Sequence, residues 1–171
     1  MGYTDPPPTA VAGQTLKAVD WNLKVRDNIS AAAKPPRARV RRTTNQSIPN
    51  NASTVLSFDT ADYVSDNIWL VGSPTRLVAP VTGIYSVKGG AQFAVNLTGA
   101  RLLFITKGVT TIATNHSVGN ASWYVGGTVE SEINLTAGEY VELLAYQASG
   151  AALNIDVAYP VWFAMSLISY G

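Results

Sequence analysis

Few residues in this sequence have types and spacing that could carry out chemistry. His116 is the only histidine, and no serine–base–acid arrangement or metal-ligand spacing surrounds it. Because one imidazole cannot build a catalytic triad or a three-ligand metal site, we interpret His116 as a loop or strand-end residue. The sequence contains no cysteine, which excludes thiol catalysis, cysteine-ligated metals and disulfides.

The acidic residues offer a second candidate chemistry. Asp59, Asp62 and Asp66 in FDTADYVSDN could collect oxygen ligands for calcium, but their spacing is not that of a calcium loop. A solvated connection is the favoured interpretation, and ion binding there is left open. Glu139 follows a glycine in TAGEYVEL, which indicates turn chemistry. The carboxylates are scattered among strand ends and loops, whereas a glycosidase needs a pair across a groove. We therefore predict no enzyme, no catalytic residue, no metal site and no cofactor.

The basic run KPPRARVRR is the strongest charge feature. Arg37, Arg39 and Arg41 share one parity around Val40, as in a strand that enters a sandwich with its arginines outward. Three interpretations stay open: binding of nucleic-acid phosphates, docking onto an acidic protein surface, and a plain solvated face. The alternation argues against the first, so we predict no nucleic-acid partner.

Aromatic side chains form another group of candidates. Most should lie in the core, but a displayed aromatic ring can stack on a sugar or fill a partner's pocket. The sequence does not sort them. The candidates in or beside β-type runs are Trp69, Trp123, Tyr124, Tyr146, Tyr159 and Trp162.

Composition limits where these residues can be placed. No apolar run approaches the ~20 residues of a membrane helix, and MGYTDPPPT lacks the pattern of a signal peptide. We expect a protein that is assembled in the cytoplasm without membrane insertion. Up to Asn45 the sequence has eight basic and three acidic residues, a net charge of +5, and the remainder has four basic and eight acidic residues, −4. This split predicts two parts that face different surroundings.

The N-terminal part reads as an arm followed by a helix. MGYTDPPPTAVAGQ is proline-rich and predicts an extended arm. Residues 15–34 lack glycine and proline and predict a short helix with an N-cap at Thr15, which Pro35 and Pro36 end. A helix this short must dock or self-associate. Its two apolar stripes are Leu16, Val19 and Leu23, and Trp21, Val25 and Ile29.

From Arg39 to Gly171 the sequence consists of short β-type runs separated by turn residues. In the clearest run, alternation from Tyr85 to Val95 predicts a strand with one buried face. This pattern predicts an all-β fold, a jelly-roll β-sandwich. The ten runs span residues 39–48, 53–58, 75–80, 83–95, 100–106, 110–118, 121–135, 140–149, 152–159 and 161–170.

Four stretches of this part carry a family resemblance. TVLSFDTADY, RLVAPVTGIYSVKGGAQF, INLTAGEYVELLAYQASGAAL and VWFAMSLI resemble strands of the complement-type globular head of the tumour necrosis factor-like jelly-roll superfamily. Glu139 replaces the commoner aspartate, and the last strand lacks the usual central glycine. The resemblance implies the fold and a homotrimer.

The helix carries a second, independent resemblance. LKAVDWNLKVRDNIS is similar to the asparagine-containing N-terminal helix of many bacteriophage tail and virion proteins, which precedes a β-rich appendage. Lys17 stands where threonine is often found.

Together the resemblances imply a bacteriophage virion protein with an anchor at residues 1–38 and a jelly-roll knob at residues 39–171. We expect a non-enzymatic homotrimer held to other virion proteins by its arm, a tail or surface appendage in host adsorption. The alternative is a capsid decoration protein that clamps neighbouring shell subunits. A host surface glycan or protein is a further expected partner, and the virion is the expected location. The expected anchoring or docking residues are Leu16, Val19, Trp21, Leu23, Arg37, Arg39, Arg41 and Arg42.

Overall fold

The computed structural model describes residues 17–171, and the chain divides into two compact units between Pro35 and Pro36. In the first unit, helical backbone covers α1 (Ala18–Asp20), η1 (Trp21–Arg26) and α2 (Asp27–Ala33). The expected extended arm and the expected N-cap at residue 15 lie outside the described residues.

The helical unit departs from a regular α-helix in its middle. The segment η1 is π-helical, and its wider turn breaks the 3.6-residue period on which the two expected stripes depend. At the end of α2, the backbone N–H of Lys34 donates to the carbonyl of Ser30 at 3.0 Å. Two prolines follow, which cannot supply the donors that a longer helix needs.

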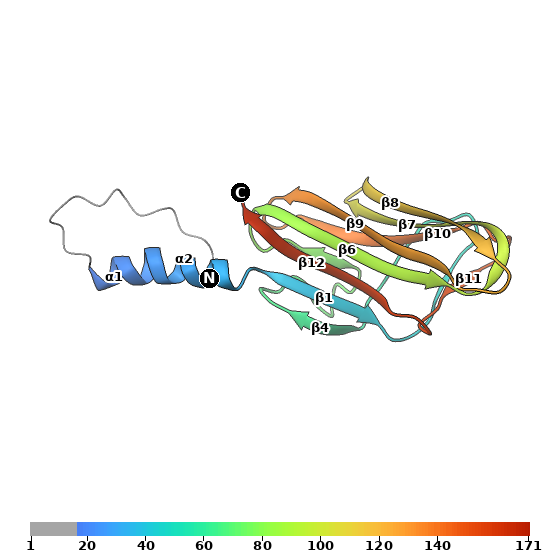
Figure 1. Cartoon of the computed structure of the whole chain (residues 1–171), viewed down its shortest axis with the longest axis horizontal. Coiled ribbons are helices and arrows are strands. Elements are labelled where there is room, and N and C mark those ends of the chain that lie inside the picture. Colours follow the sequence, from blue (N-terminus) through green and yellow to red (C-terminus); the bar gives the residue numbers. More distant parts are fainter. Residues whose placement is uncertain (1–16) are drawn as a thin grey trace. The chain divides into compact units, whose positions relative to one another are not determined.

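The second unit is a sandwich of two antiparallel sheets (Figure 1), which confirms the predicted all-β sandwich. The seven-stranded sheet A has the order β2-β11-β6-β12-β1-β4, with β9 also paired to β6; the five-stranded sheet B has the order β3-β10-β7-β8, with β5 also paired to β10. Sheet A contains β1 (Arg37–Arg42), β2 (Gln46–Ile48), β4 (Thr60–Val64), β6 (Gly83–Phe93), β9 (Val125–Leu135), β11 (Leu153–Ile155) and β12 (Val161–Tyr170). Sheet B contains β3 (Thr54–Val55), β5 (Arg76–Val78), β7 (Asn96–Lys107), β8 (Thr110–Asn120) and β10 (Tyr140–Gln147).

Strand β6 is the alternating run that the sequence predicts, and its buried face packs against sheet B. Tyr85, Val87 and Phe93 are fully buried and Lys88 is exposed, so the predicted register is confirmed. Sheet B covers this face closely: a Cβ on Gly89 would lie 2.7 Å from Cδ2 of Leu143 on β10. The expected continuation to Val95 is wrong, because β6 ends at Phe93 and Val95 is 40% exposed.

Two other expectations about strands are also corrected. The run at residues 39–48 is interrupted between β1 and β2, where the carboxylate of Asp59 accepts the backbone N–H of Thr43 at 2.9 Å. Of the three aspartates expected on a solvated connection, Asp62 instead lies in β4, which pairs with β1, whereas Asp59 and Asp66 lie outside the strand. Charged residues are common on an edge strand, because one of its faces contacts solvent. The aspartates of this segment therefore resembled a loop, and the sequence did not predict β4.

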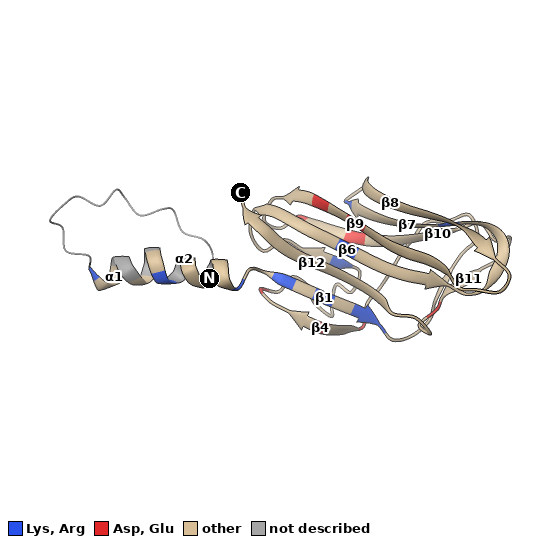
Figure 2. Cartoon of the chain, viewed as in Figure 1, with Lys and Arg blue, Asp and Glu red and all other residues tan. Residues whose placement is uncertain are grey.

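The β1 arginines belong to the sandwich, because β1 begins at Arg37, two residues before the expected start of the knob. Figure 2 shows basic residues along this strand. Residues 36–169 therefore contain eight basic and eight acidic side chains, whereas residues 1–35 contain four and three. The strong charge contrast expected between the anchor and the knob is wrong.

Candidate functional site

Strand β1 presents its arginines on the outer face of sheet A. Ala38 and Val40 are fully buried, whereas Arg37 and Arg41 are exposed and Arg39 is half-buried. This alternation follows from the two-residue period of a strand and confirms the predicted outward direction. The face thus carries a row of three cations along one strand.

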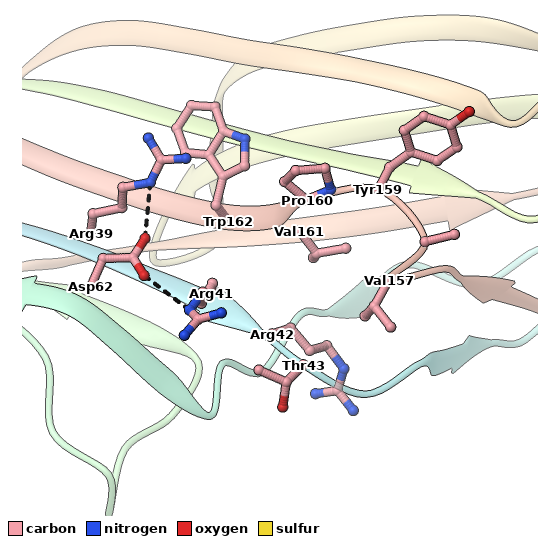
Figure 3. A pocket seen from close by; sticks show the side chains of 11 residues that line it. Arg39, Arg41, Arg42, Thr43, Asp62, Val157, Tyr159, Pro160, Val161 and Trp162 are labelled. Atoms are coloured by element: carbon pink, nitrogen blue, oxygen red, sulfur yellow. Dashed lines mark ion pairs between the residues drawn. The ribbon is translucent and has the colours of Figure 1, made fainter.

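A bulge in β4 places a carboxylate between two of these arginines. The register pairs Arg39 with Tyr63 and Val40 with Ala61, which leaves Asp62 without a partner on β1. Bulges redirect a side chain while the flanking pairs continue. Asp62 Oδ2 lies 3.2 Å from Arg39 Nε, and its Oδ1 lies 2.9 Å from Arg41 Nε (Figure 3).

Trp162 of β12 supports Arg39 from the other side. The Arg39 guanidinium carbon lies 4.5 Å from the centre of the Trp162 ring, a cation–π contact. The indole also covers Gly90 of β6, where a Cβ would lie 2.7 Å from Trp162 Nε1. The absence of a side chain at Gly90 therefore lets the indole lie on the sheet and hold Arg39 in place.

These groups line a pocket of about 450 Å³, which we call the arginine pocket. One wall is formed by the arginines and Asp62, and the opposite wall by the loop before β12, with Tyr159 and Pro160 (Figure 3). The complete lining is Arg39, Arg41, Arg42, Thr43, Asp62, Val157, Ala158, Tyr159, Pro160, Val161 and Trp162.

Both ion pairs to Asp62 use the Nε atom of the arginine. Within the described part of the chain, Asp62 is the one hydrogen-bond or ion-pair partner of the Arg39 and Arg41 guanidinium groups, and their terminal amino groups point away from it (Figure 3). The side chains of Arg39 and Arg41 are 39% and 53% exposed. The pocket therefore offers paired N–H donors and more positive than negative charge.

Arg42 has a different role from its neighbours. Its Nη1 donates to the carbonyl oxygen and the hydroxyl of Ser57 at 2.8 and 2.5 Å, and its Nη2 donates to the carbonyl of Asn45 at 3.3 Å. These bonds fasten the chain after β1. Arg42 was expected to take part in docking. In the structure, its terminal nitrogens instead bind Ser57 and Asn45.

The other predicted anchoring residues lie in the helical unit. Leu16 falls outside the described residues, and the side chains of Trp21 and Leu23 are not described. Val19 on α1 is 56% exposed. Anchoring by these residues stays a prediction.

The acidic candidates have separate partners. Burial of the Asp59 carboxyl acts to raise its pKa, but hydrogen bonds from Thr43 and Thr60 and the charge of Arg42 outweigh burial, so the pKa lies below its ordinary value. Asp66 adopts a left-handed φ of 53° in a turn. In residues 17–171 no three His, Asp or Glu side chains gather as metal ligands.

Glu139 and His116 belong to sheet B and its loops. Glu139 directly precedes β10, and His116 lies in β8. The Glu139 carboxylate accepts Lys107 Nζ at 2.7 Å and the backbone N–H of Thr136 at 2.7 Å, and these contacts lower its pKa. This is the turn chemistry that the sequence predicts. His116 was expected in a loop or at a strand end, but it is an exposed residue within β8, paired with Leu102 of β7.

The aromatic residues are sorted by their exposure. Trp69 is buried, whereas Trp123 is 69% exposed beside Tyr124, whose ring contacts Tyr159 at 5.1 Å. Tyr159 is 39% exposed and lines the arginine pocket. Sequence reasoning missed the pocket because Asp62, Trp162 and β1 meet only through strand pairing. The alternating arginines were the one local signal.

Comparisons with known proteins bear on the fold. No family model and no curated protein matches the sequence. The structure is similar to the globular domain of zebrafish complement 1qA protein, with a TM-score of 0.59 and 13% identity over 81% of this chain and all of that chain. It is also similar to murine APRIL, with a TM-score of 0.57 and 12% identity over 79% of this chain and all of that chain. None of the helices in the described residues is long and apolar enough to cross a membrane. From Pro36 onward the chain therefore has the complement 1q and tumour necrosis factor-like jelly-roll fold.

Proposed function

We propose that the chain is a non-enzymatic structural protein of a bacteriophage particle: a homotrimeric jelly-roll knob that its N-terminal arm and helix hold to the virion. The observation that carries this proposal is the division at Pro35, which separates a helical unit from a sandwich with its own core. The helix sequence resembles that of virion proteins, and the sandwich displays an open pocket. A tail or surface appendage that contributes to host adsorption fits this arrangement.

Two further points support the proposal. Domains of this fold usually form homotrimers and are generally not catalytic. Three of the carboxylates have partners within the fold, as in a structural protein: Asp62 pairs with Arg39, Glu139 with Lys107, and Asp59 with the backbone N–H of Thr43. A heterologous contact that closes as a ring would make such a trimer.

Particle incorporation tests the anchoring. A chain that begins at Pro36 should remain folded by circular dichroism, because its core lies entirely in the sandwich, but it should no longer join particles. In the full-length chain, Val19→Asp should reduce incorporation, and Ser30→Asp, an equal charge change at another exposed helical position, should reduce it less. Wild-type incorporation of the truncated chain would contradict the proposal.

Light scattering tests the assembly. The purified chain should scatter as a species of three times its 18.1 kDa mass. A stable monomer at micromolar concentration would overturn the trimer. Labelling of particles with an antibody to the knob then separates a tail appendage from a capsid decoration.

A further inference from the structure

The terminal amino groups of Arg39 and Arg41 are the starting point. A guanidinium presents a planar fork of N–H donors that matches a carboxylate, and a charged acceptor makes these hydrogen bonds stronger than neutral ones. Asp62 contacts the Nε atom of both side chains, and in the described residues no second acceptor takes the terminal N–H groups, which point away from Asp62. Two forks beside one pocket can therefore receive an oxyanion together.

The charge of the lining favours an anion over a cation. Asp62 is the acidic residue of the lining, against Arg39, Arg41 and Arg42. The charge of Arg42 acts on Asp59, which accepts the backbone N–H of Thr43 beside the pocket, so Arg39 and Arg41 share the single carboxylate of Asp62. One positive charge remains, and a ligand with its own negative charge would balance it.

The geometry of the arginine pocket is also fixed in advance. The bulge sets the position of Asp62, and Trp162 lies between Gly90 and Arg39. A site that needs little ordering loses less free energy on binding. An accidental surface pair of long side chains has no such support.

The opposite wall indicates what accompanies the anionic group. Tyr159 and Pro160 present flat, largely apolar surface, and the tyrosine is 39% exposed. A volume of about 450 Å³ lies in the range of small-molecule sites. A ligand that fits this pocket has a small ring with one apolar face, hydroxyl groups around the ring and a carboxylate. An acidic sugar has these features.

We propose that the arginine pocket binds an acidic sugar residue. Its carboxylate accepts N–H groups from the terminal nitrogens of Arg39 and Arg41, and its ring lies against Tyr159 and Pro160. This inference rests on the proposed adsorption role, because it names the class of host-surface partner for the same knob.

The test is a titration of the full-length, ¹⁵N-labelled chain with glucuronate, followed by NMR. Glucose is the matched probe, because it has the same ring without the carboxylate, and sulfate tests charge alone. We expect glucuronate to shift the signals of the pocket residues saturably, with glucose and sulfate shifting them much less. Equal shifts with sulfate, or none with glucuronate, would overturn the proposal.

Matched variants place the binding. Arg41→Gln should weaken glucuronate binding about tenfold or more, because it removes a charge-assisted donor pair. Arg37→Gln lies on the same strand and face outside the lining, so it should change binding less than about twofold. Equal effects of the two variants would contradict the assignment.

Light scattering of the same variants identifies a competing occupant. If Arg41→Gln dissociates the assembly and Arg37→Gln does not, a second copy fills the pocket and the sugar proposal is wrong. Particle incorporation is measured separately and does not depend on glucuronate. Failure of the pocket is therefore distinguishable from failure of the virion role.

Discussion

Arg101 and the arginines of the pocket are the same side chain in two opposite settings. Arg101 of β7 is 1% exposed, and it donates to the carbonyls of Asn96, Thr98 and Ala100 and to the side-chain oxygen of Asn96 at 2.8–3.3 Å. Arg39 and Arg41 are partly exposed, and each gives one nitrogen to Asp62. A guanidinium whose terminal donors are taken by neutral oxygen atoms of the chain holds the fold together, whereas one whose terminal donors point to solvent remains available to a ligand.

The electrostatics of Arg101 support this distinction. No carboxylate lies among its hydrogen-bond partners, and burial lowers its pKa from the ordinary arginine value. The group stays charged, because an arginine pKa remains far above neutral pH. Its ring contact is with Phe93, at 5.8 Å from the centroid. The charge is thus tolerated through hydrogen bonds to dipoles.

The largest effect should come from applying one substitution to both settings. Arg101→Met would remove four hydrogen bonds to partly buried oxygen atoms, so we expect the free energy of unfolding to fall by about 2–4 kcal/mol. Arg41→Met should lower it by less than about 1 kcal/mol, because an exposed ion pair contributes little. Urea denaturation of the two variants measures the contrast. Equal losses would remove the distinction between the two settings.

The next effect concerns the floor of the pocket. Gly90→Ala would place a Cβ against the Trp162 indole, which must then move away from Arg39. We expect a loss of about 1 kcal/mol or more in stability and a change in Trp162 fluorescence, since overpacking displaces a large side chain. Gly138→Ala is a poor control, because Gly138 has a φ of 90°. Ser86→Ala, a half-buried residue on the same face of β6, serves instead and should leave the fluorescence unchanged.

Much of this comparison was beyond the sequence, for physical reasons. The two-residue period predicted the buried face of β6 and the outward arginines of β1, because both depend on neighbours along one strand. In β7, however, both parities are apolar after Arg101, so the period does not reveal which face Arg101 takes. The arginine pocket depends on a one-residue bulge opposite Val40, and pairing across strands is not written in local spacing.

A smaller effect is expected at Asp59. Its carboxylate accepts hydrogen bonds from uncharged groups, just as Arg101 donates hydrogen bonds to uncharged groups. Asp59 accepts from Thr43 and Thr60, and its pKa is lowered in the folded chain. A carboxyl group whose pKa is lower in the folded chain stabilises the fold at any pH above its pKa in the unfolded chain. This stabilisation is lost as the pH falls through the pKa of the folded chain. Asp59→Asn should therefore cost about 0.5 kcal/mol at pH 7, because the site is exposed and screened. The difference from wild type should shrink as the pH falls below the ordinary aspartate pKa and through the lower folded pKa. A constant difference across the acid range in denaturant titrations would contradict this assignment.

The smallest effect should be in stability at the pocket itself. Arg41 and Arg37 lie on the same strand and face, but Arg41 pairs with Asp62, whereas Arg37 contacts the Tyr63 ring at 5.7 Å. Because both interactions are exposed, Arg41→Gln and Arg37→Gln should each change the free energy of unfolding by less than about 0.5 kcal/mol. A double-mutant cycle of Arg41→Gln with Asp62→Asn should give a coupling of no more than about 0.5 kcal/mol. If the coupling were instead several kcal/mol, the pair would be a structural element like Arg101. The free donors of Arg41 would then be a by-product of folding, and the contrast between a holding arginine and a binding arginine would fail at the pocket.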